Sequence, residues 1–197
     1  MSESLPLFPL QTVLFPDALL PLRIFESRYI DMVRECMRAG RGFGVVARFP
    51  EDEQGEASHA RIGTEAIITD FTTLEDGLLG LSTRGQRRFL IEATQARHDG
   101  LLIGEVAWLP PEPARPVAPQ YAVMQTLMRE LLRHEQLAAQ LQVDADNASS
   151  LGFALASILP LELAQAQQLL EITDPQQRLE TLMPLVEQAT IRAESQD

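Results

Sequence analysis

The sequence predicts an α+β protein in which a small β-barrel with one inserted helix is followed by a helical subdomain. Residues 1–109 contain short runs rich in β-forming residues separated by turn signals, whereas apolar residues after position 120 recur at helical spacing. The proline tract PPEPARPVAP at 110–119 suits neither a helix interior nor a central strand. We therefore expect a barrel subdomain over 1–113 and a helical subdomain over 114–197.

The opening segment reads LPLFPLQTVLFPDALLPL over residues 5–22, and its prolines exclude a helix interior. We expect short strands here, with a turn around Pro16 and Asp17. In residues 26–39 the apolar positions recur at intervals of three and four, and Gly40 follows as a C-terminal cap. This pattern predicts one amphipathic helix.

Further segments rich in β-forming residues are expected to be strands. They are 42–49, 62–71, 77–85, 86–93 and 101–109. Asp-Gly pairs at 76–77 and 99–100 lie between apolar runs, which is a strong hairpin signal. The acidic stretch PEDEQGEASHA at 50–60 predicts an exposed loop. Short antiparallel strands whose edges need protection suggest a small closed or partly open barrel.

Four helices are expected after the proline tract. The first spans residues 120–141, where the apolar residues form a helical stripe, and the second begins near Ala148. The third follows Pro160. The fourth begins with Asp174 as its N-cap, and Gln177 lies where it would complete a capping box.

The net charge of −12, from 16 basic and 28 acidic residues, disfavours nucleic acid and anionic lipid as partners. The chain has no apolar run of about twenty residues that could span a bilayer. It also has no signal peptide pattern. We therefore expect a cytoplasmic protein with neither a nucleic-acid nor a membrane partner.

All 16 basic residues are arginine, and lysine is absent. Phosphate-binding loops of the GxxxxGK[ST] kind, Schiff-base enzymes and serine-lysine proteases all need a lysine amine, which arginine cannot replace. Cys36 is the only cysteine, so the chain can form no internal disulfide and no thiolate-rich zinc site. Cys36 also shares a helix face with apolar residues, which predicts core packing. We expect neither catalytic residues nor a cofactor.

The three histidines, His59, His98 and His134, have no partner at metal-ligand spacing, so no metal site is expected. The only basic cluster consists of Arg84, Arg87 and Arg88. It is a candidate anion contact. The alternative is a solvated strand face on which these arginines pair with acidic residues such as Glu65 or Glu105.

Large apolar side chains of the opening segment are the candidate peptide-binding residues. They are Phe8, Phe15, Leu19, Leu20 and Phe25. An extended polypeptide could add a strand to the barrel edge. It could also place apolar side chains in a cleft where the barrel and the helices meet.

Three segments resemble a known family. LPLFPLQTVLFPDALLPLRIFESRY is similar to the opening of the N-terminal, substrate-binding domain of Lon proteases, and IGTEAIITDFTTLEDGLLGLSTRGQRRFLI resembles the central hairpin of that domain. ASILPLELAQAQQLLEITDPQQRLETLMPLVE resembles its helical end. The resemblance covers roughly residues 5–187, with the three segments in the family's order and spacing.

This resemblance implies a PUA-like β pseudobarrel with one inserted helix, followed by a C-terminal helical subdomain. In the family, this region is implicated in recognising unfolded or tagged substrate proteins and in assembly. The ATPase and serine-lysine protease modules of Lon lie beyond the matched region, so no catalytic residue carries over. The resemblance implies a stand-alone bacterial Lon-domain protein, for which a peptidase label would reflect only the family name.

We therefore expect a non-catalytic module of protein quality control that binds unfolded or client proteins through their exposed apolar segments. A separate protease, or a second copy of the chain, is a further expected partner. Two alternatives stay open. One is an RNA-binding PUA-like module, and the other is a small-molecule-binding sensor that uses the region from Arg84 to Arg88.

Overall fold

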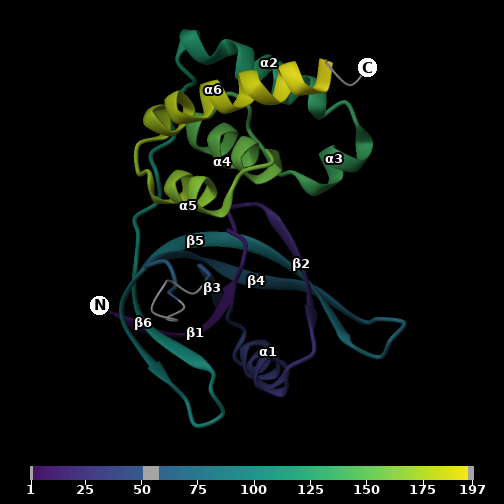
Figure 1. Cartoon of the computed structure of the whole chain (residues 1–197), viewed down its shortest axis with the longest axis vertical. Coiled ribbons are helices and arrows are strands. Elements are labelled where there is room, and N and C mark those ends of the chain that lie inside the picture. Colours follow the sequence, from purple (N-terminus) through teal and green to yellow (C-terminus); the bar gives the residue numbers. More distant parts are fainter. Residues whose placement is uncertain (1, 51–57, 195–197) are drawn as a thin grey trace. The chain divides into compact units, whose positions relative to one another are not determined.

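The computed structural model describes residues 2–50 and 58–194, with side chains described up to residue 188. The chain is α+β and forms two compact units, one that ends at Pro110 and one that begins at Pro111 (Figure 1). The first unit contains the β-strands and one helix, and the second contains helices.

The first unit contains six described strands and helix α1. The strands are β1 (Glu3–Leu10), β2 (Leu19–Ile24), β3 (Phe43–Ala47), β4 (Ile62–Thr73), β5 (Leu79–Ala96) and β6 (Leu102–Trp108). Helix α1 (Ser27–Ala39) connects β2 to β3 and ends at Gly40, whose left-handed φ of 60° forms the predicted cap. The predicted helix with its glycine cap is confirmed.

The strands form one mixed sheet in the order β2-β5-β4-β3-β1-β6. Strands β1 and β3 are parallel, and the other neighbours are antiparallel. Strand β6 also pairs with the second half of β5, so the sheet bends back on itself. Because β2 pairs with the first half of the same β5 edge, the result is a partly open pseudobarrel and not a regular closed barrel.

The two strands predicted at 77–85 and 86–93 are one continuous strand, so that prediction was wrong. The backbone at Gly85 does not turn but bonds to a distant segment. The Asp17 N–H donates to the Gly85 carbonyl, and the Gly85 N–H donates to the Ala18 carbonyl, both at 2.9 Å. A Cβ atom at Gly85 would collide with the Phe15 carbonyl. This glycine therefore permits the close approach of two segments of the chain.

Both predicted hairpins are present. Gly77 and Gly100 each have a φ of 80° in the turns that join β4 to β5 and β5 to β6. The turn predicted around Pro16 and Asp17 lies between β1 and β2, and Asp17 has a left-handed φ of 63°. Most of the predicted acidic loop lies outside the described residues.

The core of the sheet is formed by apolar side chains from β1, β3, β5 and β6. It contains Leu5, Leu7, Val46, Phe89, Ile91 and Val106. Helix α1 buries its apolar face, and Tyr29 contacts Phe8 of β1 with ring centroids 4.1 Å apart. Phe8 also lies 6.0 Å from the ring of Phe43. The contact between Phe8 and Tyr29 fixes the start of α1 beside β1.

Among the described residues, the second unit contains five α-helices and one short 3-10 helix, η1 (Pro119–Tyr121). The α-helices are α2 (Ala122–Leu131), α3 (Glu135–Gln140), α4 (Ala148–Ile158), α5 (Leu163–Glu171) and α6 (Pro175–Glu194). The prediction of one helix over 120–141 was wrong, because the chain is interrupted between α2 and α3. Helix α3 has no buried residue, so no core contact supports a continuous helix. Asp174 caps α6 as predicted by accepting from the Gln176 N–H at 2.9 Å.

A buried ion pair lies at the centre of the helical unit. The side chain of Arg178 in α6 is fully buried, and its guanidinium contacts the Glu112 carboxylate with Nη1–Oε2 and Nη2–Oε1 distances of 2.9 and 2.5 Å. It also donates to the carbonyls of Leu169 and Ile172. The guanidinium carbon lies 3.7 Å from the centroid of the Phe153 ring. The pair thus connects the segment before η1 with α4, α5 and α6.

Candidate functional site

A groove of about 570 Å³ opens in the sheet unit where two strands have an unpaired edge. Strand β1 pairs with β6 only through residues 3–7, so its residues 8–10 pair on one side, with β3. Strand β2 pairs with β5 alone among the described strands. We call this cavity the edge groove. It is lined by Phe8, Pro9, Leu10, Pro21, Leu22, Arg23, Ile24, Phe25, Glu26, Arg28, Tyr29, Arg48, Gly100 and Leu102.

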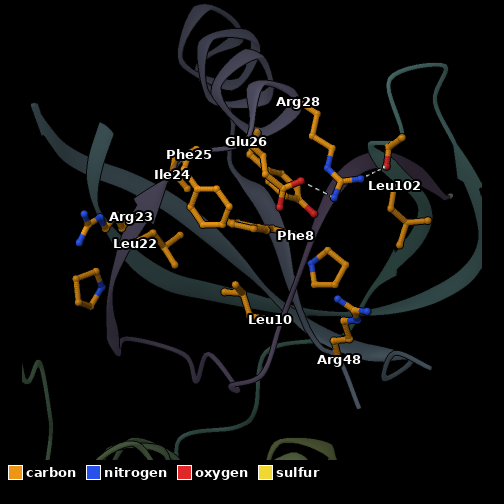
Figure 2. Close-up of a pocket in the computed structure, with 14 residues that line it drawn as sticks. Phe8, Leu10, Leu22, Arg23, Ile24, Phe25, Glu26, Arg28, Arg48 and Leu102 are labelled. Atoms are coloured by element: carbon orange, nitrogen blue, oxygen red, sulfur yellow. Dashed lines mark hydrogen bonds and ion pairs between the residues drawn. The ribbon is translucent and has the colours of Figure 1, made fainter. Parts of the chain in front are cut away.

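Figure 2 shows how three separate parts of the chain meet at the edge groove. Phe8 and Leu10 of β1 lie in the middle, Leu22 lies on the β2 side, and Leu102 of β6 lies on the opposite side. The innermost side chains are apolar, since Phe8 and Ile24 are buried. The volume falls within the range of about 300–1,000 Å³ that is usual for ligand sites. The groove therefore has an apolar floor that is open to solvent.

Phe25 lies at the rim of the edge groove and is unusually exposed. Its exposed fraction is 69%, whereas most large apolar side chains of this unit are buried. It directly follows β2 and directly precedes Glu26, which occupies the N-cap position of α1. Phe25 therefore adds exposed apolar surface to the rim of the edge groove.

Two prolines line the edge groove, one on each unpaired strand edge. Pro9 belongs to β1 and Pro21 to β2. Proline has no backbone N–H, so neither edge offers a continuous row of hydrogen-bond donors. A guest that paired with either strand over several residues would meet this interruption.

Arg28 connects the start of α1 to the turn between β5 and β6. Its Nη2 atom lies 2.6 Å from a Glu26 carboxylate oxygen, and its Nη1 atom donates to the Gly100 carbonyl at 3.0 Å (Figure 2). The guanidinium carbon also lies 4.9 Å from the Tyr29 ring centroid. These contacts hold one wall of the edge groove in place, and Glu26 compensates the charge of Arg28.

The two other arginines of the edge groove differ in their partners. Arg23 forms an ion pair with Asp76 of the β4–β5 turn. Arg48 follows β3 and is exposed, and across residues 2–50 and 58–194 no ion pair or side-chain hydrogen bond involves it. The groove thus contains three arginines and one glutamate in a chain whose net charge is −12.

Tyr29 adds a polar group to the otherwise apolar inner part of the edge groove. Burial raises the pKa of its phenol above the ordinary value, with Arg28 and Arg48 lowering it and Glu26 raising it. The phenol therefore stays neutral at neutral pH and can donate or accept a hydrogen bond.

The structure places the five predicted peptide-binding residues in three different environments. Phe8 and Phe25 line the edge groove. Leu19 and Leu20 lie on β2 outside the groove lining, with Leu19 at the border of exposure and Leu20 half-buried. Phe15 is buried beside the turn that packs on Gly85, so its side chain offers no surface to a partner.

The three arginines of β5 do not converge on one site. Arg84 donates to the Asp17 carbonyl at 2.7 Å. Arg87 pairs with Glu65 at 3.1 Å and lies over the Trp108 ring at 3.8 Å. Arg88 is buried. The predicted pairing with Glu65 is therefore confirmed for Arg87, and the charge of this arginine has a partner within the fold.

Several groove residues were missed by the sequence analysis. Leu10, Leu22, Arg28, Arg48 and Leu102 come from separate elements, and none belongs to a recognisable motif. In the sequence, these residues are distinguished only by lying in or near a predicted strand or helix. Long-range strand pairing brings them together, and the sequence alone does not specify that pairing.

No group of three or more histidine, cysteine, aspartate or glutamate side chains in the described part of the chain is arranged to hold a metal ion. Cys36 is fully buried in α1, and burial raises the pKa of its thiol to about 11. The described helices include none that is long and apolar enough to cross a membrane.

The fold is that of an α+β domain with a groove at the edge of its sheet, and comparison with known proteins identifies its family. A model of the ATP-dependent protease La (LON) substrate-binding domain matches residues 4–188. The chain therefore belongs to the LON substrate-binding domain family.

Solved structures and sequence relatives agree with this assignment. The crystal structure of a Lon N-terminal domain protein from Xanthomonas campestris is 38% identical, has a TM-score of 0.79, and matches over 92% of this chain and 98% of that chain. The N-terminal domain of the Mycobacterium avium complex Lon protease shares the fold, with a TM-score of 0.70 at 20% identity over 94% of this chain and 98% of that chain. Lon protease from Cytophaga hutchinsonii is 28% identical over 93% of this chain. The chain spans 24% of the length of that relative.

Proposed function

We propose that this domain binds extended apolar segments of other polypeptides in the edge groove and performs no chemistry on them. The observation that supports this proposal is an apolar floor between two strands that each lack a neighbour on the groove side. Membership of a substrate-binding domain family adds a second, independent support.

The groove favours docking by side chains over addition of a complete strand. Pro9 and Pro21 interrupt the donors of the two strand edges, so a guest would form few backbone hydrogen bonds there. Phe8, Leu22 and Ile24 instead offer apolar contacts. An apolar side chain gains about 1.5–3 kcal/mol when it is fully buried, which is enough to drive weak binding of an unfolded chain.

The groups around the groove support a role without catalysis. Arginine, glutamate and tyrosine line it, and none of them is placed as a nucleophile beside a general base. The chain also lacks lysine, which the serine-lysine and phosphate-binding chemistries need. We propose a role in protein quality control in which bound clients are passed to a separate protease.

A direct test compares two exposed phenylalanines of the same unit. Phe25 lies in the edge groove, whereas Phe71 of β4 lies outside it with 57% of its surface exposed. The purified chain is titrated with a fluorescent, permanently unfolded model protein. Phe25→Ser should weaken binding by about 1–2 kcal/mol, or roughly five- to thirtyfold in Kd. Phe71→Ser should leave Kd unchanged.

The two substitutions remove the same side chain from similarly exposed positions, so both should change stability by less than about 0.5 kcal/mol. Equal effects of the two variants on Kd would show that the edge groove is not the binding site. Absence of binding by the unsubstituted chain at tens of micromolar would contradict the proposed function itself.

A further inference from the structure

We infer that the edge groove selects extended segments in which an acidic side chain neighbours an apolar one, and that Arg48 is the main contact of the acidic group. This inference rests on the proposed function and specifies the class of segment that the groove holds.

The charges around the edge groove single out Arg48. Arg23 and Arg28 are compensated by Asp76 and Glu26, respectively. Within the described part of the chain, the guanidinium of Arg48 has no ion-pair partner. A guanidinium without a partner beside an apolar surface is complemented best by a carboxylate, which can accept two parallel N–H donors. One acidic group of a guest therefore fits this position.

The burial of the groove residues predicts the position of the acidic residue in the guest sequence. Phe8 and Ile24 are buried in the floor, whereas Arg48 is exposed. Figure 2 shows Arg48 apart from the group formed by Leu22, Arg23 and Phe25. Successive side chains of an extended chain point to opposite sides. When one apolar side chain enters the floor, its neighbours in sequence face outward, where an acidic group can meet Arg48.

The same geometry favours an acidic side chain over the carboxylate at a chain end. A terminal carboxylate held within the groove would need donors at its inner end. The side chains buried there are apolar except for Tyr29, and Arg28, whose Nε atom is buried without a hydrogen-bond partner, has its charge already compensated by Glu26. Arg48, which has no ion-pair partner among the described residues, is exposed. A segment can thus pass through the groove and present Asp or Glu side chains outside the floor.

The experiment measures Kd for short fluorescent peptides by anisotropy. One peptide alternates leucine or phenylalanine with aspartate, a second replaces each aspartate with asparagine, and both have amidated C-termini. A third carries asparagine and a free C-terminal carboxylate. The unsubstituted chain should bind the aspartate peptide roughly two- to fivefold more tightly than either other peptide, the range expected of an exposed ion pair.

Arg48→Gln should abolish this preference, and Arg34→Gln is the matched control. Arg34 is an exposed arginine of α1 that does not line the edge groove, and its loss lowers the net charge by the same amount. Arg48→Glu should reverse the preference, so that a peptide with lysine in place of aspartate binds more tightly. This reversal would exclude simple misfolding as the cause.

Each outcome decides the inference. Equal binding of all three peptides, or a preference that survives Arg48→Gln, would overturn it while the proposed function stands. A preference confined to the free C-terminal carboxylate would also overturn it. Loss of binding to every peptide and to the unfolded model protein would instead reject the proposed function.

Discussion

The buried ion pair between Arg178 and Glu112 should make a single charge in the helical unit decisive for its stability. We predict that Glu112→Gln destabilises this unit strongly. The carboxylate is nearly buried, contacts two guanidinium nitrogens, and accepts from the Ser149 hydroxyl at 2.5 Å. Removal of its charge leaves a fully buried guanidinium without a counterion.

The expected size follows from measurements on buried pairs in general, where loss of one partner costs about 3–5 kcal/mol. Glutamine keeps the shape and one acceptor, so we expect the lower end, about 3 kcal/mol. For a unit of this size that corresponds to about 12–24 °C in Tm. Because domains are stable by only about 5–15 kcal/mol, a large part of the helical unit's stability would be lost.

Urea denaturation followed by far-ultraviolet circular dichroism measures this effect, because most helices belong to the second unit. Arg129→Gln is the matched control, since it breaks an exposed pair with Asp146 and should cost less than about 1 kcal/mol. A double substitution, Glu112→Leu with Arg178→Met, should be less destabilising than Glu112→Leu alone. A loss below about 1 kcal/mol for Glu112→Gln would refute the reasoning.

Two further predictions concern titratable groups. Cys36 is buried, and burial raises the pKa of its thiol to about 11. A thiol reagent should therefore react slowly with the folded chain at neutral pH and rapidly after unfolding. Equal reaction rates for the folded and unfolded chain would contradict the burial of Cys36. Hydrogen bonds from Arg97 hold the pKa of Asp99 well below its ordinary value, so Asp99 stabilises the fold above its unfolded-state pKa and loses that effect as pH falls. The difference in urea midpoint between the unsubstituted chain and Asp99→Asn should therefore shrink from about pH 5 to pH 2, and a constant difference would exclude this linkage.

Local signals in the sequence predicted much of the fold. The Asp-Gly pairs that end in Gly77 and Gly100 predicted two hairpins, and both glycines have the left-handed φ that such turns require. Gly40 likewise predicted the end of α1. In each case, one residue's backbone preference decides the structure of its own neighbourhood, so a reading of adjacent residues is sufficient.

Gly85 shows where local signals fail. It stands between two apolar runs and predicted a strand end, but its role is to let the segment around Asp17 bond to the middle of β5. That contact joins residues far apart in the sequence. The same limit applies to the interruption between α2 and α3, because lack of a core contact ends the first helix, not a proline or glycine.

The candidate site was predicted only in part for the same reason. Phe8 and Phe25 were identified because they are large and apolar in a segment with many prolines. Arg48 and Leu102 are ordinary residues at strand ends, and they become part of a groove only when β1 pairs with both β3 and β6. Residues that come together only through long-range strand pairing form no motif with a fixed spacing in the sequence.

Under the proposed function, Pro9 and Pro21 also affect how a bound polypeptide would leave the edge groove. A protein that holds unfolded polypeptides risks templating them, because an open strand edge can extend from one chain to the next into a fibrous stack. A proline on each rim stops such growth within the groove. In the proposed complex, the guest would then be held mainly by side-chain contacts, which favours its release.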